Sequence, residues 1–343
     1  MATSALLKLG MITVEPHGRP WAEVLSRRSD VKMEYAWDYD ASRARAYAAK
    51  YNIPQVVNCV EDMLGKVDAV LIGGGRRPPT ADGIWGEEPD DHLKLARPFL
   101  EKGMPTLIDK PFADKLDDAI EMVRLARAHA APLMSCSAMR YDSQVLAMKQ
   151  VIDDGGLGNV AGAVCMIGTG AATLKWYIIH MLEAVHTGFG PGIESVFALP
   201  SHVPVVPDKP ELAKAYALVF RWTDGRLATM MLVCDETDAA ETKERPGRAP
   251  RILWPTASIV PPYLPLHYSI RVYGDMNWVD VRPVGKGCYS RKLEAFLEMV
   301  RTGKQAIPLE STLELTQALV VAEQSLKSGK LEMLRPVAEL VGG

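Results

Sequence analysis

The chain has 343 residues, of which 48% are hydrophobic and 24% are charged, and its formal net charge is −3. This composition is typical of a globular protein with a full core, and the length favours two domains. Because a slightly acidic chain offers no positive field to polyanions, we expect no nucleic-acid partner and no anionic membrane partner.

The five cysteines are scattered, odd in number and without a C-x-x-C pair, which disfavours a zinc site or a redox dithiol. Such cysteine usage is typical of a protein of the reducing cytoplasm. The opening residues lack the pattern of a signal peptide, and no run of about 18 apolar residues predicts a membrane span. We therefore expect a cytoplasmic protein.

The first part of the chain alternates strand-like and helix-like patterns. Mostly apolar runs predict strands at 6–14, 31–38, 69–74 and 105–111. Amphipathic patterns predict helices at 21–28, 41–51, 91–102 and 116–129. Mostly apolar strands are typical of strands that are covered on both faces. Their alternation with helices predicts βαβ units around a parallel sheet, which is an α/β fold.

The pattern changes near residue 132. We expect strands at 133–141, 159–168, 214–222, 226–235, 267–274 and 277–283, and helices at 142–158, 289–304 and 313–330. An Asp-Gly turn at Asp224 predicts a hairpin. The Pro-rich insert 241–267 favours a binding loop or a subunit contact. We expect a parallel-sheet domain at residues 1–131 and an α+β domain with a largely antiparallel, open sheet at 132–343.

Four short motifs follow one another along the chain: DKPFA at 109–113, AMRY at 138–141, IIHMLEAV at 178–185 and the closing KLEAFLEMVRTGK helix with its later SGK end. In this order and spacing they resemble the Gfo/Idh/MocA family, the glucose-fructose oxidoreductases and inositol dehydrogenases. The resemblance covers nearly the whole chain. It implies a Rossmann domain followed by an open-sheet α+β domain, binding of NAD or NADP, and oxidation or reduction of a hydroxyl of a sugar or cyclitol.

The resemblance places the G-x-G-x-x-G fingerprint on Thr13, Glu15 and Gly18, so only the third glycine is kept. Glu15 brings a negative charge to the place where a diphosphate would lie, and a nearby cation such as His17 offsets it. The helix start after Gly18 still attracts anions. We expect Thr13, Val14, His17 and Gly18 to contact the cofactor; the alternative is a Rossmann-like turn that binds no dinucleotide.

Asp38 lies 20 residues after Gly18, where an acidic residue binds the ribose hydroxyls of NAD and repels the extra phosphate of NADP. The sequence therefore favours NAD over NADP, although Asp38 is also placed to cap the next helix. Further on, Gly73 and Gly74 precede two arginines in the long loop 72–92. That loop predicts either an anion-binding nest or a solvated surface loop.

Lys110 stands at the carboxyl end of a parallel strand, the edge at which open α/β sheets bind ligands. An ammonium at this place hydrogen-bonds a carbinol oxygen and stabilises a developing alkoxide. We expect Lys110 to be catalytic and to contact the cofactor, with Asp109 orienting it or contacting the cofactor itself. The alternative is an ordinary surface lysine.

His180 lies on a predicted helix whose spacing places Trp176, Tyr177 and Glu183 on the same face. Histidine suits acid–base work near neutral pH, and a tyrosine beside it is able to donate to the same oxygen. We expect His180 and Tyr177 to be catalytic and both, with Trp176, to bind substrate. The family's D-x-G-x-H motif would place an aspartate at position 176, so Tyr177 is the candidate replacement; the alternative is a core histidine.

Arg140 is expected either to anchor a substrate anion or to tie the domains together. His92 starts a predicted helix, which the resemblance places below the nicotinamide. The alternative is that His92 only caps or packs this helix. The remaining histidines His186, His202 and His267 have no ligand spacing, so we expect no metal.

Three hypotheses follow from these residues. The first is an NAD-linked oxidoreductase acting on a secondary alcohol of a sugar, cyclitol or related small molecule. The second is a lyase or isomerase on the same scaffold, and the third is a small-molecule-binding or partner-binding protein that has lost cofactor binding. An exposed sheet face makes us expect a homo-oligomer, a dimer or tetramer.

Overall fold

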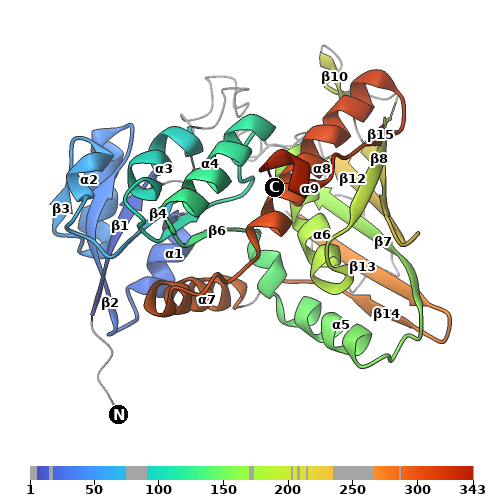
Figure 1. Cartoon of the computed structure of the whole chain (residues 1–343), viewed down its shortest axis with the longest axis horizontal. Helices are drawn as coiled ribbons and strands as arrows, with labels where there is room; N and C mark the ends of the chain where they lie inside the picture. Colours follow the sequence, from blue (N-terminus) through green and yellow to red (C-terminus); the bar gives the residue numbers. More distant parts are fainter. Residues whose placement is uncertain are drawn as a thin grey trace, which may run out of the picture.

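The computed structural model describes residues 6–14, 18–74, 91–169, 174–201, 204–206, 209–213, 215–234, 266–285 and 287–342. Figure 1 shows two sheets lying side by side, each with helices packed on it. Glu15, His17, the two arginines of the loop 72–92 and most of the Pro-rich insert lie outside the described residues, as does the side chain of Trp176.

The first sheet is six-stranded and parallel throughout. Its spatial order is β3 (Gln55–Val56), β2 (Val31–Trp37), β1 (Leu7–Ile12), β4 (Ala69–Ile72), β5 (Thr106–Ile108) and β6 (Leu133–Ser135). Central strands β1, β4 and β5 are almost wholly buried, as apolar runs covered on both faces should be. The α/β parallel sheet predicted from the sequence is confirmed.

Helices cover both faces of this sheet. One face packs against α1 (Gly18–Leu25), α2 (Ala41–Tyr51) and α7 (Cys288–Thr302). The other packs against the short helix η1 (Val60–Met63), α3 (His92–Leu100), α4 (Leu116–Ala128) and α9 (Val337–Leu340). Two of these helices, α7 and α9, come from the far end of the chain, as the red ribbon beside the blue and cyan elements in Figure 1 shows.

The second sheet is seven-stranded. Its order is β14 (Trp278–Val281), β13 (Leu266–Gly274), β7 (Val160–Thr169), β12 (Leu227–Cys234), β11 (Ala215–Trp222), β8 (Ile193–Pro200) and β15 (Glu332–Met333). All neighbours are antiparallel except β7 and β12, which run parallel. The predicted, largely antiparallel sheet is therefore confirmed, and so is the hairpin at Asp224. A separate two-stranded ribbon pairs β9 (Pro204–Val206) with β10 (Lys209–Ala213).

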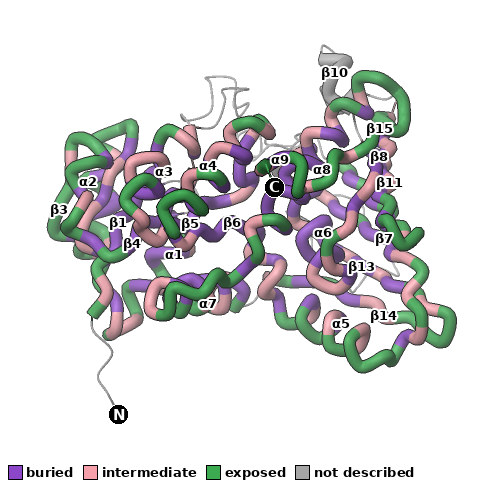
Figure 2. Tube along the Cα trace, in the orientation of Figure 1, coloured by how far each residue is buried: buried purple, intermediate pink, exposed green. Residues whose placement is uncertain are grey.

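Among the described residues, helices cover one face of the second sheet. Helices α5 (Ser143–Asp153), α6 (Leu174–Phe189) and α8 (Leu309–Ser328) share a core with that face. The opposite face leaves apolar side chains in solvent, among them Val164, Met166 and Met231, which are 53%, 45% and 42% exposed. Figure 2 shows the resulting alternation of buried and exposed positions along these strands.

The strand predicted at 133–141 is only partly a strand. The extended segment ends at Ser135, and Ala138–Tyr141 forms a short 3₁₀ helix, η2. The turn is favoured because the Ser137 hydroxyl accepts a hydrogen bond from the Met139 N–H at 3.1 Å and so caps η2. The strands β3, β8, β9, β10 and β15 were not predicted. The domain boundary at residue 131 stays a prediction.

Within the described parts of the chain, no helix combines the length and the apolar character that crossing a membrane requires.

Candidate functional site

The candidate site lies along the carboxyl edge of the parallel sheet. In spatial order, the strands end next to Asp38 (β2), Thr13 (β1), Gly73 (β4), Lys110 (β5) and Ser137 (β6). Because parallel strands end at a common edge, residues far apart in the sequence become neighbours. Strand β1 lies between β2 and β4, where the strand order reverses, and open α/β sheets bind ligands at such a switch point.

Thr13, where the resemblance places the first glycine of the fingerprint, has the backbone shape that a glycine would give. Its φ is +52°, a left-handed conformation that is strained for a β-branched residue. Its N–H donates to the Trp37 carbonyl at 2.9 Å. Its hydroxyl donates to the Ile12 carbonyl at 2.7 Å and accepts from the Gly74 N–H at 2.8 Å. These hydrogen bonds hold Thr13 in a left-handed conformation, which a threonine disfavours.

Gly73 lets two loops approach each other closely. A Cβ at this position would lie 2.5 Å from the Thr13 carbonyl oxygen and 3.2 Å from the Gly18 nitrogen. Any side chain would therefore separate the end of β4 from the start of α1.

Asp38 joins the end of β2 to the first turn. One carboxylate oxygen accepts from the Val14 N–H at 3.0 Å; the other accepts from the Asp40 N–H at 3.0 Å and lies 3.1 Å from the Arg43 guanidinium. Since a carboxylate offers about four acceptor positions, these three bonds leave about one for a ligand hydroxyl. The cap of α2 is Asp40, so the structure gives the capping role considered for Asp38 to its neighbour.

Lys110 follows β5 and reaches toward the second sheet's helices. Its Nζ lies 5.8 Å from the ring centroid of Tyr177 on α6, within cation–π range. The structure thus brings together two residues that the sequence predicted to be catalytic, one from each part of the chain.

Asp109, beside Lys110, is tied to a buried lysine that the sequence analysis missed. Lys292 on α7 is 1% exposed. Its Nζ lies 3.5 Å from an Asp109 carboxylate oxygen, donates to the Cys136 carbonyl at 2.7 Å and lies 5.2 Å from the Trp21 ring centroid. Lys292 therefore links Asp109, which follows β5, to Cys136, which follows β6. In sequence it looks like any charged residue of an amphipathic helix.

His180 is held by contacts on several sides. Its Nδ1 lies 2.6 Å from the Ser137 hydroxyl oxygen. The Tyr177 and Tyr268 rings pack edge-on against its ring, with centroids 6.2 Å and 5.6 Å away. Burial, with a further contribution from Tyr177, raises the pKa of Tyr268. Tyr268 comes from β13 and Ser137 from the end of β6, and neither was singled out in the sequence.

Arg140 lies in a buried ion pair. Its Nε donates to Glu183 at 2.7 Å, and the side chains are 15% and 4% exposed. Burial, the largest single effect, would lower the pKa of Arg140, but the charge of Glu183 and the hydrogen bond to it, together with Cys136 and Tyr141, raise it. Arg140 also lies 3.4 Å from Nδ1 of His186. This arrangement favours the second of the two roles expected for Arg140, the tie between elements; substrate anchoring stays a prediction.

His92 is the first residue of α3 and is buried. Its Nδ1 lies 3.1 Å from the Phe112 carbonyl oxygen, which fixes α3 to the segment that follows Lys110. Among the described residues, no group of three His, Cys, Asp or Glu side chains is placed to hold a metal.

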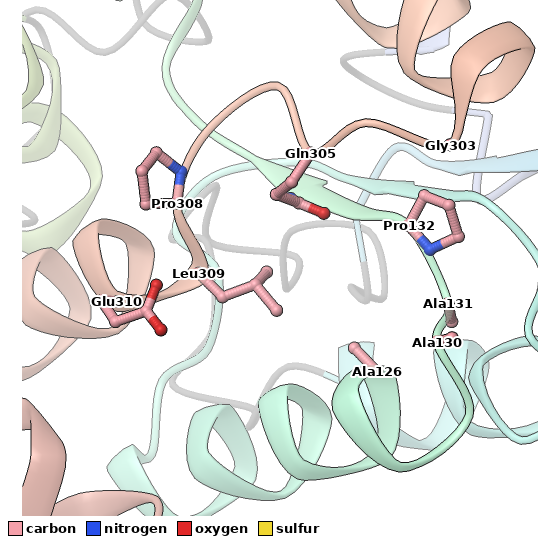
Figure 3. A pocket seen from close by; sticks show the side chains of 9 residues that line it. All are labelled: Ala126, Ala130, Ala131, Pro132, Gly303, Gln305, Pro308, Leu309 and Glu310. Carbon is pink, nitrogen blue, oxygen red and sulfur yellow. The ribbon is translucent and has the colours of Figure 1, made fainter.

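A cavity of about 520 Å³ lies at the opposite edge of the sheet. Figure 3 shows it between the end of α4, the approach to β6 at Pro132 and the segment from Gly303 to Glu310. The Gln305 amide bonds the backbone of Leu133, and Glu310 pairs with Arg127. Its polar side chains are thus engaged in holding elements together, and the cavity lies away from Lys110 and His180.

The chain is similar to a family model, to curated proteins and to solved structures. The family model GFO_IDH_MocA, described as an oxidoreductase family with an NAD-binding Rossmann fold, matches residues 8–136. The match covers the residues of the first sheet, and over these residues it agrees with the resemblance stated from the short motifs.

A curated relative aligns with part of the chain. Inositol 2-dehydrogenase 3 of Saccharopolyspora erythraea is 29% identical over 132 residues, which span 38% of this chain and 35% of that protein. The alignment thus covers about a third of the curated relative's length.

Two solved structures match nearly the whole chain. Myo-inositol 2-dehydrogenase from Lactobacillus plantarum matches with a TM-score of 0.74 and 15% identity, over 96% of this chain and 99% of that one. Scyllo-inositol dehydrogenase from Lactobacillus casei, solved with NAD(H) and scyllo-inositol, matches with a TM-score of 0.73 and 14% identity, over 97% and 99%. At these identities the likeness shows that both parts of the chain share the fold of those structures.

Proposed function

We propose that the protein is an NAD-dependent oxidoreductase that transfers a hydride to or from a secondary alcohol of a cyclitol, sugar or related small molecule. The observation that carries the proposal is the meeting of Lys110 with Tyr177 and His180 at the carboxyl edge of the parallel sheet. An ammonium, a phenol and an imidazole gathered there supply the groups that carbinol chemistry needs.

The described residues around the first turn support a dinucleotide site. Gly73 allows the close approach of the β4 end to Gly18, and the start of α1 offers backbone N–H groups and a positive dipole end to a diphosphate. Asp38 keeps about one acceptor position for a ribose hydroxyl. Its negative charge disfavours the extra phosphate of NADP, so NAD is the proposed cofactor.

The chain's own residues have separate tasks in this reaction. Bound NAD would accept or return the hydride. The Lys110 ammonium hydrogen-bonds the substrate oxygen and stabilises its negative charge as the C–H bond breaks or forms. His180 exchanges the hydroxyl proton at Nε2, the ring nitrogen opposite the one that faces Ser137. Tyr177, next to both, orients the same oxygen.

The direct test is turnover of a panel of inositols and hexoses with NAD, followed by NADH absorbance, together with titration of NADH followed by its fluorescence. We expect NADH to bind and at least one cyclic polyol to be oxidised. Binding without turnover of any polyol would favour the lyase or isomerase hypothesis, and absence of binding would favour the binding protein.

The ribose assignment predicts a loss of affinity in one variant. Asp38→Ala removes the acceptor for the ribose and releases the Val14 N–H, so NADH affinity should fall by about tenfold or more, since a hydrogen bond to a charged group contributes about 1.5–3 kcal/mol. Asp40→Ala, which removes only the cap of α2, is the matched control for fluorescence titration. Equal affinities in the two variants would reject the assignment.

We also propose that the exposed face of the second sheet is a contact between copies of the chain. Val164, Met166 and Met231 lie on neighbouring strands of that face, and contiguous apolar surface of this kind marks an interaction site. Met166→Lys should shift the protein from dimer or tetramer toward monomer in light scattering after size exclusion. Met276→Lys, at the 78% exposed tip between β13 and β14, should not; the same mass for wild type and Met166→Lys would contradict this interface.

A further inference from the structure

We propose that Ser137 is a positioning residue for His180: it fixes the imidazole plane and stays hydrogen-bonded to Nδ1 while His180 gains and loses its proton. This inference rests on the proposed function, in which His180 moves the substrate proton. Ser137 does not itself contact the reacting atoms in this scheme.

The Ser137 side chain is placed by the backbone around it. Its Oγ lies 2.6 Å from Nδ1 of His180 and accepts from the Met139 N–H at 3.1 Å. Ser137 is wholly buried, so water does not compete for the hydroxyl.

The backbone of Ser137 is fixed as well. Its N–H donates to Glu183 Oε1 at 3.1 Å, while Arg140 donates to Glu183 Oε2 at 2.7 Å. One turn of α6 separates Glu183 from His180, so the same helix that carries the imidazole also holds the residue that orients it. The Arg140–Glu183 ion pair thus holds the Ser137 backbone in the position from which its hydroxyl contacts His180.

Aromatic rings restrict the remaining freedom of the imidazole. Tyr177 and Tyr268 pack against it edge-on at interplanar angles of 61° and 71°. A hydrogen bond at Nδ1 sets the rotation of the ring, and the two tyrosines set its tilt. Together these contacts hold Nε2 in one direction.

A hydroxyl is suited to a histidine that changes charge. To take the hydroxyl proton at Nε2, neutral His180 must carry its own proton on Nδ1, so Nδ1–H donates to Ser137 Oγ, whose other lone pair accepts the Met139 N–H. When Nε2 gains the proton, the Nδ1–H bond to Oγ remains. The serine therefore keeps the ring aligned in both halves of an acid–base cycle.

Several ionisable groups lie on α6 and on the elements around it, and they must stay in place in any test. They are Lys110 and Asp109 at the end of β5, Arg140 on η2, Tyr177 and Glu183 on α6, and Tyr268 on β13. Ser137→Ala removes the hydroxyl and leaves all of these groups unchanged.

The first measurement uses the full chain without substrate. The ¹⁵N signals of the histidine rings are followed against pH in wild type, Ser137→Ala and Thr187→Val, which removes a hydroxyl bonded to the Glu183 carbonyl on the same helix. We expect the Nδ1 signal and the titration midpoint of His180 to change in Ser137→Ala only, while His92, His129 and His186 stay as in wild type. A folded Ser137→Ala protein with unchanged His180 signals would overturn the inference.

The second measurement compares kinetics. With a polyol that is turned over, Ser137→Ala should lower kcat by about tenfold, less than the 10²–10⁴-fold that loss of an acid–base group costs, with KM nearly unchanged and the pH profile displaced as the His180 midpoint is. Equal kcat in Ser137→Ala and wild type, with His180 signals changed, would leave the contact established and remove His180 from the proposed chemistry. The two measurements thus separate failure of the positioning role from failure of the proposed function.

Discussion

Lys110→Ala is expected to lower kcat by about 10²–10⁴-fold, the range typical for removal of a group that stabilises charge or moves a proton at the reacting oxygen. The loss should appear in kcat rather than in KM, because the ammonium acts on negative charge that develops only in the transition state. Steady-state rates with NAD and a polyol measure it, and NADH fluorescence confirms that the cofactor site is intact.

Lys115→Ala is the matched control for Lys110→Ala. Lys115 lies five positions further along the chain and is exposed at the start of α4, so its loss should leave kcat at the wild-type value. Lys110→Arg keeps the charge but changes its shape and should restore only part of the rate. If Lys110→Ala retained near-normal kcat, Lys110 would have no part in the chemistry.

Glu183→Gln is expected to lower the free energy of unfolding by about 3–5 kcal/mol, the usual cost of removing one partner of a buried ion pair. Glu183 is 4% exposed and accepts from both the Arg140 side chain and the Ser137 backbone. Glutamine keeps one acceptor and turns the other into a donor that faces existing donors. Chemical denaturation followed by tryptophan fluorescence measures the effect.

Glu294→Gln provides the comparison. Glu294 pairs with Arg28 at the surface, with 54% of its side chain exposed, and exposed pairs contribute about 0–1 kcal/mol. The same chemical change should therefore cost far less at position 294 than at position 183. Similar costs at both positions would show that the Arg140–Glu183 pair does not stabilise the fold through its burial.

Local sequence patterns were sufficient for most of the first sheet. Helix α2 was predicted with both ends correct, because Asp40 and Ser42 give a clear start and Asn52 ends the helix in a left-handed conformation. Strands β1, β2, β4 and β5 were found because buried parallel strands are continuous apolar runs. The family resemblance then supplied Lys110 and His180, and the structure places both near Tyr177.

Other features depend on contacts between residues distant in the sequence. Nothing around Ser137 marks it as the partner of His180, since that contact exists only once β6 and α6 are packed together. Lys292 reads as a surface residue until α7 lies against the ends of β5 and β6. The turn at Thr13 lacks its first glycine, yet a backbone bond to Trp37 and a bond from the Gly74 N–H to the Thr13 hydroxyl hold the glycine-like shape.

Helix α7 has a consequence for how the protein is made. It covers one face of the first sheet, where Trp21 and Lys292 meet, but it is synthesised after every strand of both large sheets except β15. On the ribosome, the apolar layer around Trp21 must therefore wait for almost the entire chain to emerge. Contacts between such distant segments slow folding, and the exposed nascent surface is where we expect chaperones to bind.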